Sequence, residues 1–277
     1  MRNLTETTAT AAVIRKFDGC ADARLRQVMT ALVGHLHAFV REIEPSEAEW
    51  FAAIGFLTAT GQMCDDRRQE FILLSDTLGV STLVELINNR KQPGATETSV
   101  FGPFWVANAP LREYGESIVR DATPPTLRVH GVVTGPDGAP VGDALMDVWQ
   151  TAPNGLYDVQ DPDQPEGNLR ARFRTRPDGS FAFRTVKPTP YPIPHDGPVG
   201  MLLEAGGRHP WRPSHLHVMI EAPGFRKLIT ALYFEGDPYL DSDAVLGVKD
   251  SLVVRPAPAA DGIADLRYDF ALERAPG

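Results

Sequence analysis

Apolar positions in the first part of the chain recur at helical spacing. Over residues 10–87 they repeat every three or four positions, as in Val28, Leu32 and Leu36, and the only proline is Pro45. This spacing stacks side chains along one face of an α-helix. We therefore predict several helices in this part of the chain.

Short apolar runs bounded by turn residues replace that pattern after residue 125. The runs occupy residues 127–133, 144–149, 171–175, 181–186, 215–221 and 228–234. Two of the turns between them have the sequence Pro-Asp-Gly, at 136–138 and 177–179, which is typical of hairpins. Short strands at this spacing predict an antiparallel β-sandwich.

A segment rich in glycine and proline, residues 94–125, separates the two patterns. This composition predicts an extended connection rather than a helix or a strand. Connections between rigid elements often carry functional residues. The expected fold class is α+β, with a helical region over residues 1–98, a linker to about residue 125 and a β-sandwich over residues 126–277.

Composition narrows the class of protein. The chain has 277 residues, of which 43% are hydrophobic, so it is long enough to bury a full core. Its net charge of −9 offers no basic face for a phosphate backbone, so we expect a small-molecule ligand rather than nucleic acid. Cys20 and Cys64 are too few for a disulfide framework, and neither a long apolar run nor a leader stands out. We therefore expect a cytoplasmic protein without a membrane segment.

Two histidines mark the most informative stretch of the sequence. His215 and His217 begin an expected strand, where alternate side chains project to the same face, so both can bind one metal ion. The alternative is a pair of packed or solvent-exposed histidines. His35 and His37 have the same spacing on an expected helix, where side chains two apart point about 200° apart around the axis. For that pair we predict a structural role.

Further metal ligands must come from elsewhere in the chain, and two tyrosines have unusual surroundings. Tyr157 follows an expected strand, and Tyr191 lies among the four prolines of residues 188–194, which fix the backbone and remove donors. An exposed turn tyrosine is the alternative for each. Two imidazoles and two phenolates would favour ferric iron. Arg212, three residues before His215, adds a cation, for which a surface salt bridge is the alternative.

Four strings of residues, taken together, resemble the intradiol ring-cleaving dioxygenases. They are Val-Phe-Gly-Pro-Phe at 100–104, Gly-Leu-Tyr-Asp at 155–158, Pro-Tyr-Pro-Ile-Pro at 190–194 and Trp-Arg-Pro-Ser-His-Leu-His at 211–217. The likeness runs in the same order from about residue 71 to residue 268. Residues 195–200 and 207–211 resemble the hydroxyquinol 1,2-dioxygenase branch of that family more than the catechol branch.

This resemblance implies an enzyme that inserts both atoms of O2 into a catechol-type diphenol, between its two hydroxyls. Hydroxyquinol (benzene-1,2,4-triol) is the expected substrate, and catechol or a substituted catechol is the alternative. The resemblance implies one Fe(3+) per subunit, held by Tyr157, Tyr191, His215 and His217. Tyr191 would also act as a base, and Arg212 takes the position of the arginine that stabilises the developing substrate carbanion.

The resemblance also implies an assembly and a substrate pocket. The helical region would form a homodimer, with a phospholipid bound at the interface. The expected pocket residues are Leu73, Asp76, Val100, Phe101, Gly102, Pro103, Phe104, Pro192, Ile193 and Arg212. Core packing is the alternative for the apolar members. For Asp76 we expect a hydrogen bond from a third ring hydroxyl, with N-capping of the next helix as the alternative.

One position departs from the pattern of the family. Ala231 stands where the resemblance leads us to expect glutamine or histidine. Its small side chain would either enlarge the pocket or remove a contact that supports the metal ligands. We therefore expect this position to affect substrate preference.

Two other classes of protein compete with this interpretation. A cupin-like iron(II) or zinc site would use His215, His217 and Glu221, which share one strand face. The flanking glycines of that motif do not fit, because His209 stands in place of the leading one and Pro223-Gly224 ends the strand. A non-catalytic β-sandwich that binds or transports a ligand is the second alternative, and it leaves the two tyrosines and Arg212 without a role.

Overall fold

The first two α-helices begin where the sequence offers capping side chains. The computed structural model describes residues 2–65, 68–90 and 93–275, and the chain divides into Met1–Ala59 (unit 1) and Thr60–Gly277 (unit 2). In α1 (Glu6–Ile14) the Thr5 side chain accepts a hydrogen bond from the backbone N–H of Thr8, and Asp22 caps α2 (Ala23–Ile43) in the same way. These contacts satisfy backbone donors that the first turn of a helix leaves unpaired.

Unit 1 contains α1, the short helix η1 (Arg15–Phe17), α2 and most of α3 (Glu47–Gln62). The helices predicted for this part are confirmed. His37 hydrogen-bonds to the hydroxyl of Thr10 at 3.1 Å, which joins α2 to α1, whereas His35 is exposed. The structural role predicted for this histidine pair therefore agrees with its contacts.

An apolar stripe on α2 stays exposed in the isolated chain. It consists of Leu25, Val28, Leu32, Leu36, Phe39, Val40 and Ile43, each 42–55% exposed. Contiguous apolar surface of this kind is typical of a face that binds a partner. None of the described helices has the length and apolarity needed to cross a membrane.

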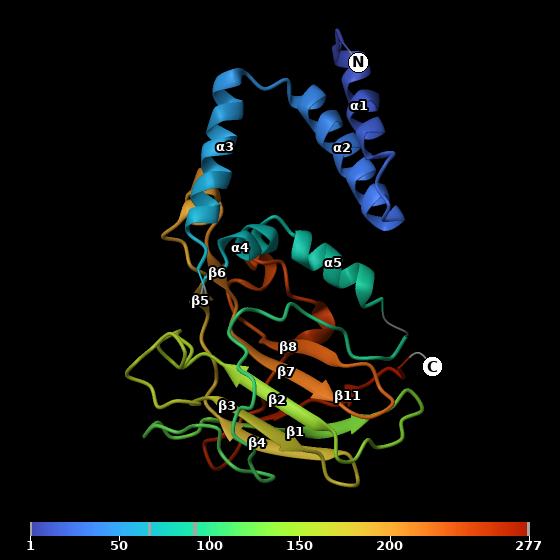
Figure 1. Ribbon diagram of the computed structural model, residues 1–277. Coiled ribbons are helices and arrows are strands. Elements are labelled where there is room, and N and C mark those ends of the chain that lie inside the picture. The colour runs from blue at the N-terminus through green and yellow to red at the C-terminus, as the bar shows by residue number, and fades with distance from the viewer. Residues whose placement is uncertain (1, 66–67, 91–92, 276–277) are drawn as a thin grey trace. The chain divides into compact units, whose positions relative to one another are not determined.

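Unit 2 carries two packed sheets (Figure 1). The strands are β1 (Leu127–Thr134), β2 (Leu145–Gln150), β3 (Arg170–Arg174), β4 (Ser180–Thr185), β5 (Tyr191–Pro192), β6 (Trp211–Arg212), β7 (His215–Glu221), β8 (Leu228–Phe234), β9 (Val253–Val254), β10 (Ala264–Arg267) and β11 (Phe270–Ala271). One sheet joins β1 to β4, β10 and β11, and the other has the order β3-β2-β7-β8-β9. All six predicted strands form, and the predicted α+β class is confirmed.

The expectation of purely antiparallel sheets needs correction. Strands β10 and β11 pair with β1 in parallel, and β9 pairs with β8 in parallel, so both sheets are mixed. These three strands have two to four residues each, too few for the alternating pattern that identifies a strand in a sequence. The predicted domain boundary near residue 98 stays a prediction, although helices α1–α5 all end before that residue and β1 begins after it.

The alternation along β7 determines which residues face the core. Leu216, Val218 and Ile220 belong to the cluster packed between the two sheets. His215 and His217 therefore project from the opposite face of the same sheet. The functional residues thus lie outside the sandwich core, on a face that other segments must cover.

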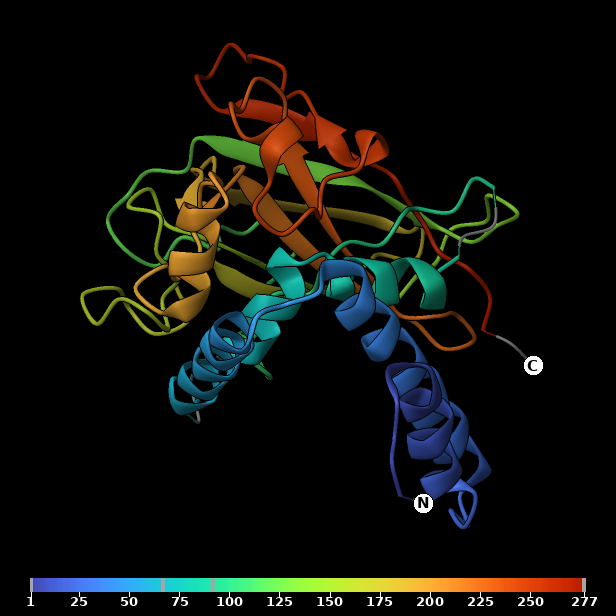
Figure 2. The same ribbon diagram turned by 90° about the horizontal axis from the view of Figure 1, so that it is seen from above.

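The covering segments are α4 (Glu70–Thr77), α5 (Val80–Asn88), the extended segment 94–125 and α6 (Pro198–Ala205), the gold helix beside the strands in Figure 2. The backbone N–H of Ser99 donates to the carbonyl of Ile229 at 3.0 Å, which fixes the extended segment against β8. The fully buried carboxylate of Glu70 accepts from the N–H of Val199 at 3.1 Å, which joins α4 to α6. These long-range contacts hold the extended segment, α4 and α6 in place over the outer face of the sheet.

Candidate active site

The two histidines of β7 point their ring nitrogens toward each other. Their Nε2 atoms lie 3.0 Å apart, and both rings are buried. The Nδ1–H of His215 donates to the carbonyl of Pro213 at 2.7 Å, so Nε2 carries the lone pair with which this ring can bind a metal ion. His217 Nδ1 has no partner among the described residues, but the ring stacks on Trp149 with a centroid distance of 4.8 Å and an interplanar angle of 5°.

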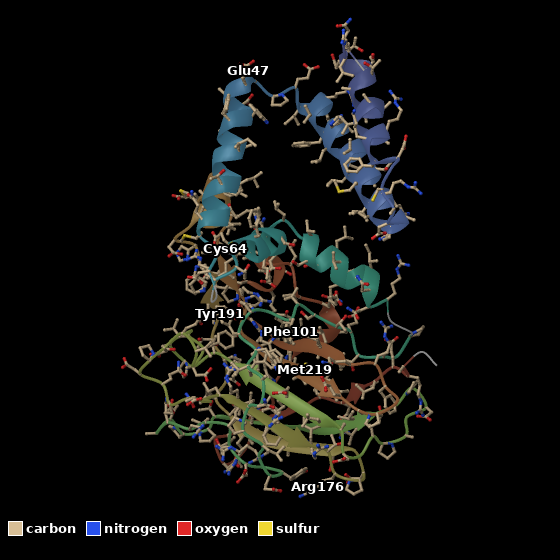
Figure 3. All side chains as sticks on the ribbon, viewed as in Figure 1. Glu47, Cys64, Phe101, Arg176, Tyr191 and Met219 are labelled. Atoms are coloured by element: carbon tan, nitrogen blue, oxygen red, sulfur yellow. The ribbon has the colours of Figure 1, made fainter. Side chains whose placement is uncertain are left out.

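The two tyrosines reach the same place from separate segments. Tyr157 comes from the loop after β2 and Tyr191 from β5, and their hydroxyl oxygens lie 3.5 Å apart. The ring of Tyr191 is 5.4 Å from that of His215. In Figure 3 the labelled Tyr191 lies near Met219, in the same apolar cluster as Tyr157 and Trp149. Neither tyrosine is the exposed turn residue of the alternative interpretation, since both are buried.

Burial dominates the electrostatics of Tyr157, His215 and His217. It lowers the pKa of His215 and His217 well below the ordinary value, so both imidazoles are neutral. Burial, followed by the neighbouring Tyr191, raises the pKa of Tyr157 well above the ordinary value. Ionisation of this phenol therefore requires a nearby cation such as a metal ion.

The spacing of the donor atoms fits a single metal ion. Two nitrogens bound at about 2.1 Å and at a right angle are about 3 Å apart, and two oxygens bound at about 2.0 Å and 120° are about 3.5 Å apart. The Nε2 pair and the phenol oxygen pair have these separations. In the described part of the chain no three His, Cys, Asp or Glu residues gather as a metal site. The two phenol oxygens are the further oxygen atoms that the structure brings to this place.

Arg212 is buried beside this group of donors. It lies on β6, which pairs with β5 so that Arg212 is directly opposite Tyr191. One of its terminal nitrogens, Nη1, is 3.3 Å from Nε2 of His215. Burial lowers the pKa of Arg212, but the nearby Asp243 and two tyrosines outweigh it and raise the pKa well above the ordinary value. The guanidinium is therefore a permanent cation, and the surface salt bridge of the alternative interpretation is excluded.

The expected pocket residues lie in two groups around the donors. Leu73 and Val100 pack against a cluster that includes Ile193, and the ring of Phe101 meets Trp149 edge-on at 5.7 Å. Phe104 stacks on Tyr157 with a centroid distance of 4.4 Å. A Cβ atom on Gly102 would lie 3.5 Å from Cε1 of His217, so the glycine leaves open the space in front of that ring.

Asp76 lies close enough to Arg212 for their charges to interact. It lies in α4 and is not the N-cap of α5, which is Gly79, so the capping alternative is wrong. Burial raises the pKa of Asp76, while a hydrogen bond with Ser81 and the charge of Arg212 lower it in part. The carboxyl group is therefore half-buried, and it interacts with the charge of Arg212.

Several residues of this site were not identified from the sequence, among them Tyr233, whose hydroxyl lies 3.4 Å from Nη2 of Arg212. Trp149 stacks on His217, Asp243 pairs with Arg212, and Val245 packs with Ile193 and the residues around Leu73. The same alternation that identified the histidines predicts the face of Trp149, because the two strands are neighbours in register. Asp243 and Val245 lie in an irregular segment that carries no comparable pattern.

The cupin-like alternative finds no support in the position of Glu221. Its carboxylate pairs with Lys227 and is 43% exposed, at the far end of β7 from His215.

Ala231 lies directly opposite His217 on β8 and is fully buried. No polar side chain at that position supports His217.

Comparison with known proteins agrees with this geometry. Residues 100–274 match the family described as "Dioxygenase", and residues 22–96 match "Catechol dioxygenase N terminus". The chain belongs to the intradiol ring-cleavage dioxygenase family, whose members use non-haem iron.

Several relatives within the family are named for hydroxyquinols. The chain is 49% identical to 6-chlorohydroxyquinol 1,2-dioxygenase of Cupriavidus pinatubonensis, over 98% of this chain and 99% of the relative. It is 53% identical to hydroxyquinol 1,2-dioxygenase of Nocardioides simplex, over 87% of this chain and 82% of the relative. The crystal structure of hydroxyquinol 1,2-dioxygenase from Pseudomonas putida DLL-E4 matches with a TM-score of 0.92 and 52% identity, covering 98% of this chain and 99% of the other.

Proposed function

We propose that this enzyme cleaves hydroxyquinol between its adjacent hydroxyls with both atoms of O2. The product is 3-hydroxy-cis,cis-muconate, the tautomer of maleylacetate. The observation that carries the proposal is the convergence of Tyr157, Tyr191, His215 and His217, in a chain about half identical to two enzymes named for hydroxyquinols.

Those four side chains would hold one Fe(3+) per subunit. The ion would supply a Lewis acid to which the two oxygens of the diphenol can bind, which would make the ring reactive toward O2. The support for a ferric ion is the chemistry of the donors, since two phenolates and two neutral imidazoles form a hard, anionic set.

The remaining steps can be assigned to groups of the protein. The phenolate oxygen of Tyr191 would take one proton of the incoming diphenol, because this residue lies on β5 at the side of the site lined by Arg212. Nη1 of Arg212 would then donate to the substrate oxygen on which negative charge develops. In a buried site this stabilisation is stronger than in water, and it needs no reorientation.

Asp76 would select the third hydroxyl of hydroxyquinol. The half-buried carboxyl group beside an otherwise apolar pocket supports this role, because it can accept a hydrogen bond from the third hydroxyl in addition to the one it forms with Ser81. The apolar members Leu73, Val100, Phe101, Pro103, Phe104, Pro192 and Ile193 would hold the ring, and Gly102 leaves room for it. Catechol is the second candidate substrate, favoured by the wholly apolar group around Ile193.

We also propose that the chain forms a homodimer through its N-terminal helices, with a phospholipid at the interface. The exposed apolar stripe of α2 supports this arrangement, because it needs an apolar partner. The cytoplasmic location expected from the sequence remains a prediction.

An anaerobic visible spectrum of the purified enzyme tests the proposal. Iron bound by tyrosinates is expected to give a red-brown band that shifts on addition of hydroxyquinol, and less readily on addition of catechol. An iron-loaded but colourless protein would exclude the two-tyrosine site. In Asp76→Asn we expect the preference for hydroxyquinol over catechol, in kcat/KM, to fall by about 10-fold, since the hydrogen bond to a charged carboxylate becomes a weaker one to a neutral amide oxygen. An unchanged preference would contradict the role of Asp76.

A further inference from the structure

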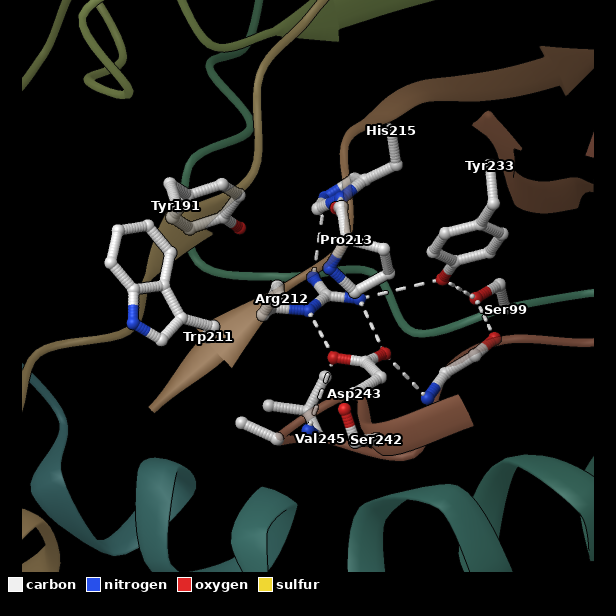
Figure 4. Close-up of polar contacts among 12 residues, drawn as sticks. Ser99, Tyr191, Trp211, Arg212, Pro213, His215, Tyr233, Ser242, Asp243 and Val245 are labelled. Carbon is white, nitrogen blue, oxygen red and sulfur yellow. Dashed lines mark hydrogen bonds and ion pairs between the residues drawn. The ribbon is translucent and has the colours of Figure 1, made fainter. Parts of the chain in front are cut away.

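The guanidinium of Arg212 is held along one edge by a single carboxylate. Nε donates to Oδ1 of Asp243 at 3.0 Å and Nη2 donates to Oδ2 at 3.3 Å (Figure 4). Both side chains are almost fully buried. A two-point contact of this kind fixes the rotation of the planar group as well as its position.

Asp243 is itself fixed by the backbone. Its Oδ1 accepts from the N–H of Val245 at 3.3 Å, and its Oδ2 accepts from the N–H of Gly247 at 2.9 Å. Rotation of the carboxylate would break both contacts and leave buried donors unpaired. The carboxylate is therefore a rigid anchor for Arg212.

Tyr233 holds the same guanidinium from another side. Nη2 of Arg212 lies 3.4 Å from the Tyr233 hydroxyl, which is 2.8 Å from Oγ of Ser99. Because Ser99 donates its only hydroxyl proton to the carbonyl of Gly247 at 2.8 Å, the Tyr233 O–H must donate to Ser99. The Tyr233 oxygen is then free to accept from Nη2. Gly247 thus takes part in two of these hydrogen bonds: its carbonyl accepts from Ser99, and its N–H donates to Asp243.

These contacts leave Nη1 as the one nitrogen of the guanidinium that is directed at the proposed metal ligands. Nε and Nη2 are engaged by Asp243 and Tyr233, whereas Nη1 faces Nε2 of His215 at 3.3 Å. Gly247 leaves room for this packing, since a Cβ atom there would lie 2.9 Å from the Tyr233 hydroxyl and 3.1 Å from Nη2. The cluster is thus built around one orientation of the guanidinium.

We propose that Asp243 and Tyr233 are positioning residues that keep Nη1 of Arg212 directed at the substrate, and so set the rate of the chemical step without binding iron or substrate. This inference rests on the proposed role of Arg212. A displacement of about 1 Å in a reacting group lowers rates by about 100-fold.

The test compares Asp243→Asn, Tyr233→Phe and Arg212→Ala, each loaded with iron. We expect all three to keep the iron content, the anaerobic tyrosinate band and its shift with hydroxyquinol. We expect kcat to fall by about 100-fold in Asp243→Asn and about 10-fold in Tyr233→Phe, with KM within threefold of the original enzyme. Tyr268→Phe is the matched control, because that hydroxyl donates to the carbonyl of Ser251 at 3.1 Å, and its kcat should be unchanged.

Double variants separate positioning from an independent effect. If Asp243 and Tyr233 act through Arg212, adding either substitution to Arg212→Ala will lower kcat no further. An equal further loss would overturn the inference, as would loss of iron or of the band in Tyr233→Phe. Should Asp243→Asn fail to fold, Tyr233→Phe and its double variant still decide the question. Full activity of Arg212→Ala would refute the proposed role of Arg212. If Arg212→Ala is slow while Asp243→Asn and Tyr233→Phe are fully active, the positioning proposal is refuted and the proposed role of Arg212 stands.

Discussion

The hydroxyl oxygens of Tyr157 and Tyr191 lie 3.5 Å apart, although the residues come from a loop and from a two-residue strand. Both rings are buried, and they meet edge-on at 5.6 Å. Two phenolates this close repel each other unless a cation lies between them. As phenols the two can share a hydrogen bond, and as phenolates they would need the shared metal ion that we propose.

Replacing one of these phenols should remove the metal or the reaction. We expect Tyr157→Phe to lose most of its iron or nearly all turnover, because the donor set then has one anion fewer. Iron content per chain and the visible band measure the effect. Tyr114→Phe, at an exposed position, is the control and should retain both. Original iron content and full activity in Tyr157→Phe would end the ligand assignment.

A buried ion pair holds the segment that carries Tyr157. Arg170 contacts both oxygens of Asp158 and donates through Nη1 to the carbonyl of Phe104 at 3.0 Å. We expect Asp158→Asn to lower the free energy of unfolding by about 3–5 kcal/mol, because a buried charge loses its partner. The exposed pair Arg174–Asp143, at 3.0 Å, is the control, and Asp143→Asn should cost at most about 1 kcal/mol. Urea unfolding curves measure both, and equal losses would contradict the argument.

Gly102 should be replaceable only at the expense of substrate binding. Its φ of +71° strains an alanine, and the added Cβ atom would occupy the space in front of His217. We expect Gly102→Ala to raise KM for hydroxyquinol by about 10-fold or more, as for the loss of room for one methylene group. Gly94 has a φ of +89° with no atom near its Cβ position, so Gly94→Ala isolates the backbone strain. Both variants should lose on the order of 1 kcal/mol of stability. A similar KM for the two would refute the steric explanation.

Asp147 should make stability depend on pH. Burial raises the pKa of Asp147 from 3.8 to about 6, against the opposing charge of Arg172. The folded state therefore holds this proton more tightly than the unfolded state. Its contribution to stability is complete below about pH 4 and is lost as the pH rises to about 6.

The comparison variant is Asp147→Asn, which cannot ionise. Its stability relative to the original protein should rise between pH 4 and pH 6 by on the order of 1–2 kcal/mol, after allowance for solvent screening. Urea unfolding at pH 4, 5, 6 and 7.5 measures the difference. A difference that stays constant across this range would show that the carboxyl group has an ordinary pKa.

The sequence by itself determined the local elements and part of the site. The bounds of β7, His215–Glu221, match the expected strand, because Leu216, Val218 and Ile220 alternate along it with the two histidines. The same alternation predicted that His215 and His217 share a face. His35 and His37 were distinguished from that pair because residues two apart on a helix point in different directions.

Only the tertiary structure decided the contacts between distant segments. Tyr191 lies opposite Arg212 because β5 pairs with β6, and strands of two residues have no periodic pattern to recognise. Asp243 binds Arg212 across 31 residues, and Glu70 binds the N–H of Val199 across 129 residues. Buried charges and donors take such partners only when the packed fold excludes water, and that exclusion is a property of the whole chain rather than of any local sequence.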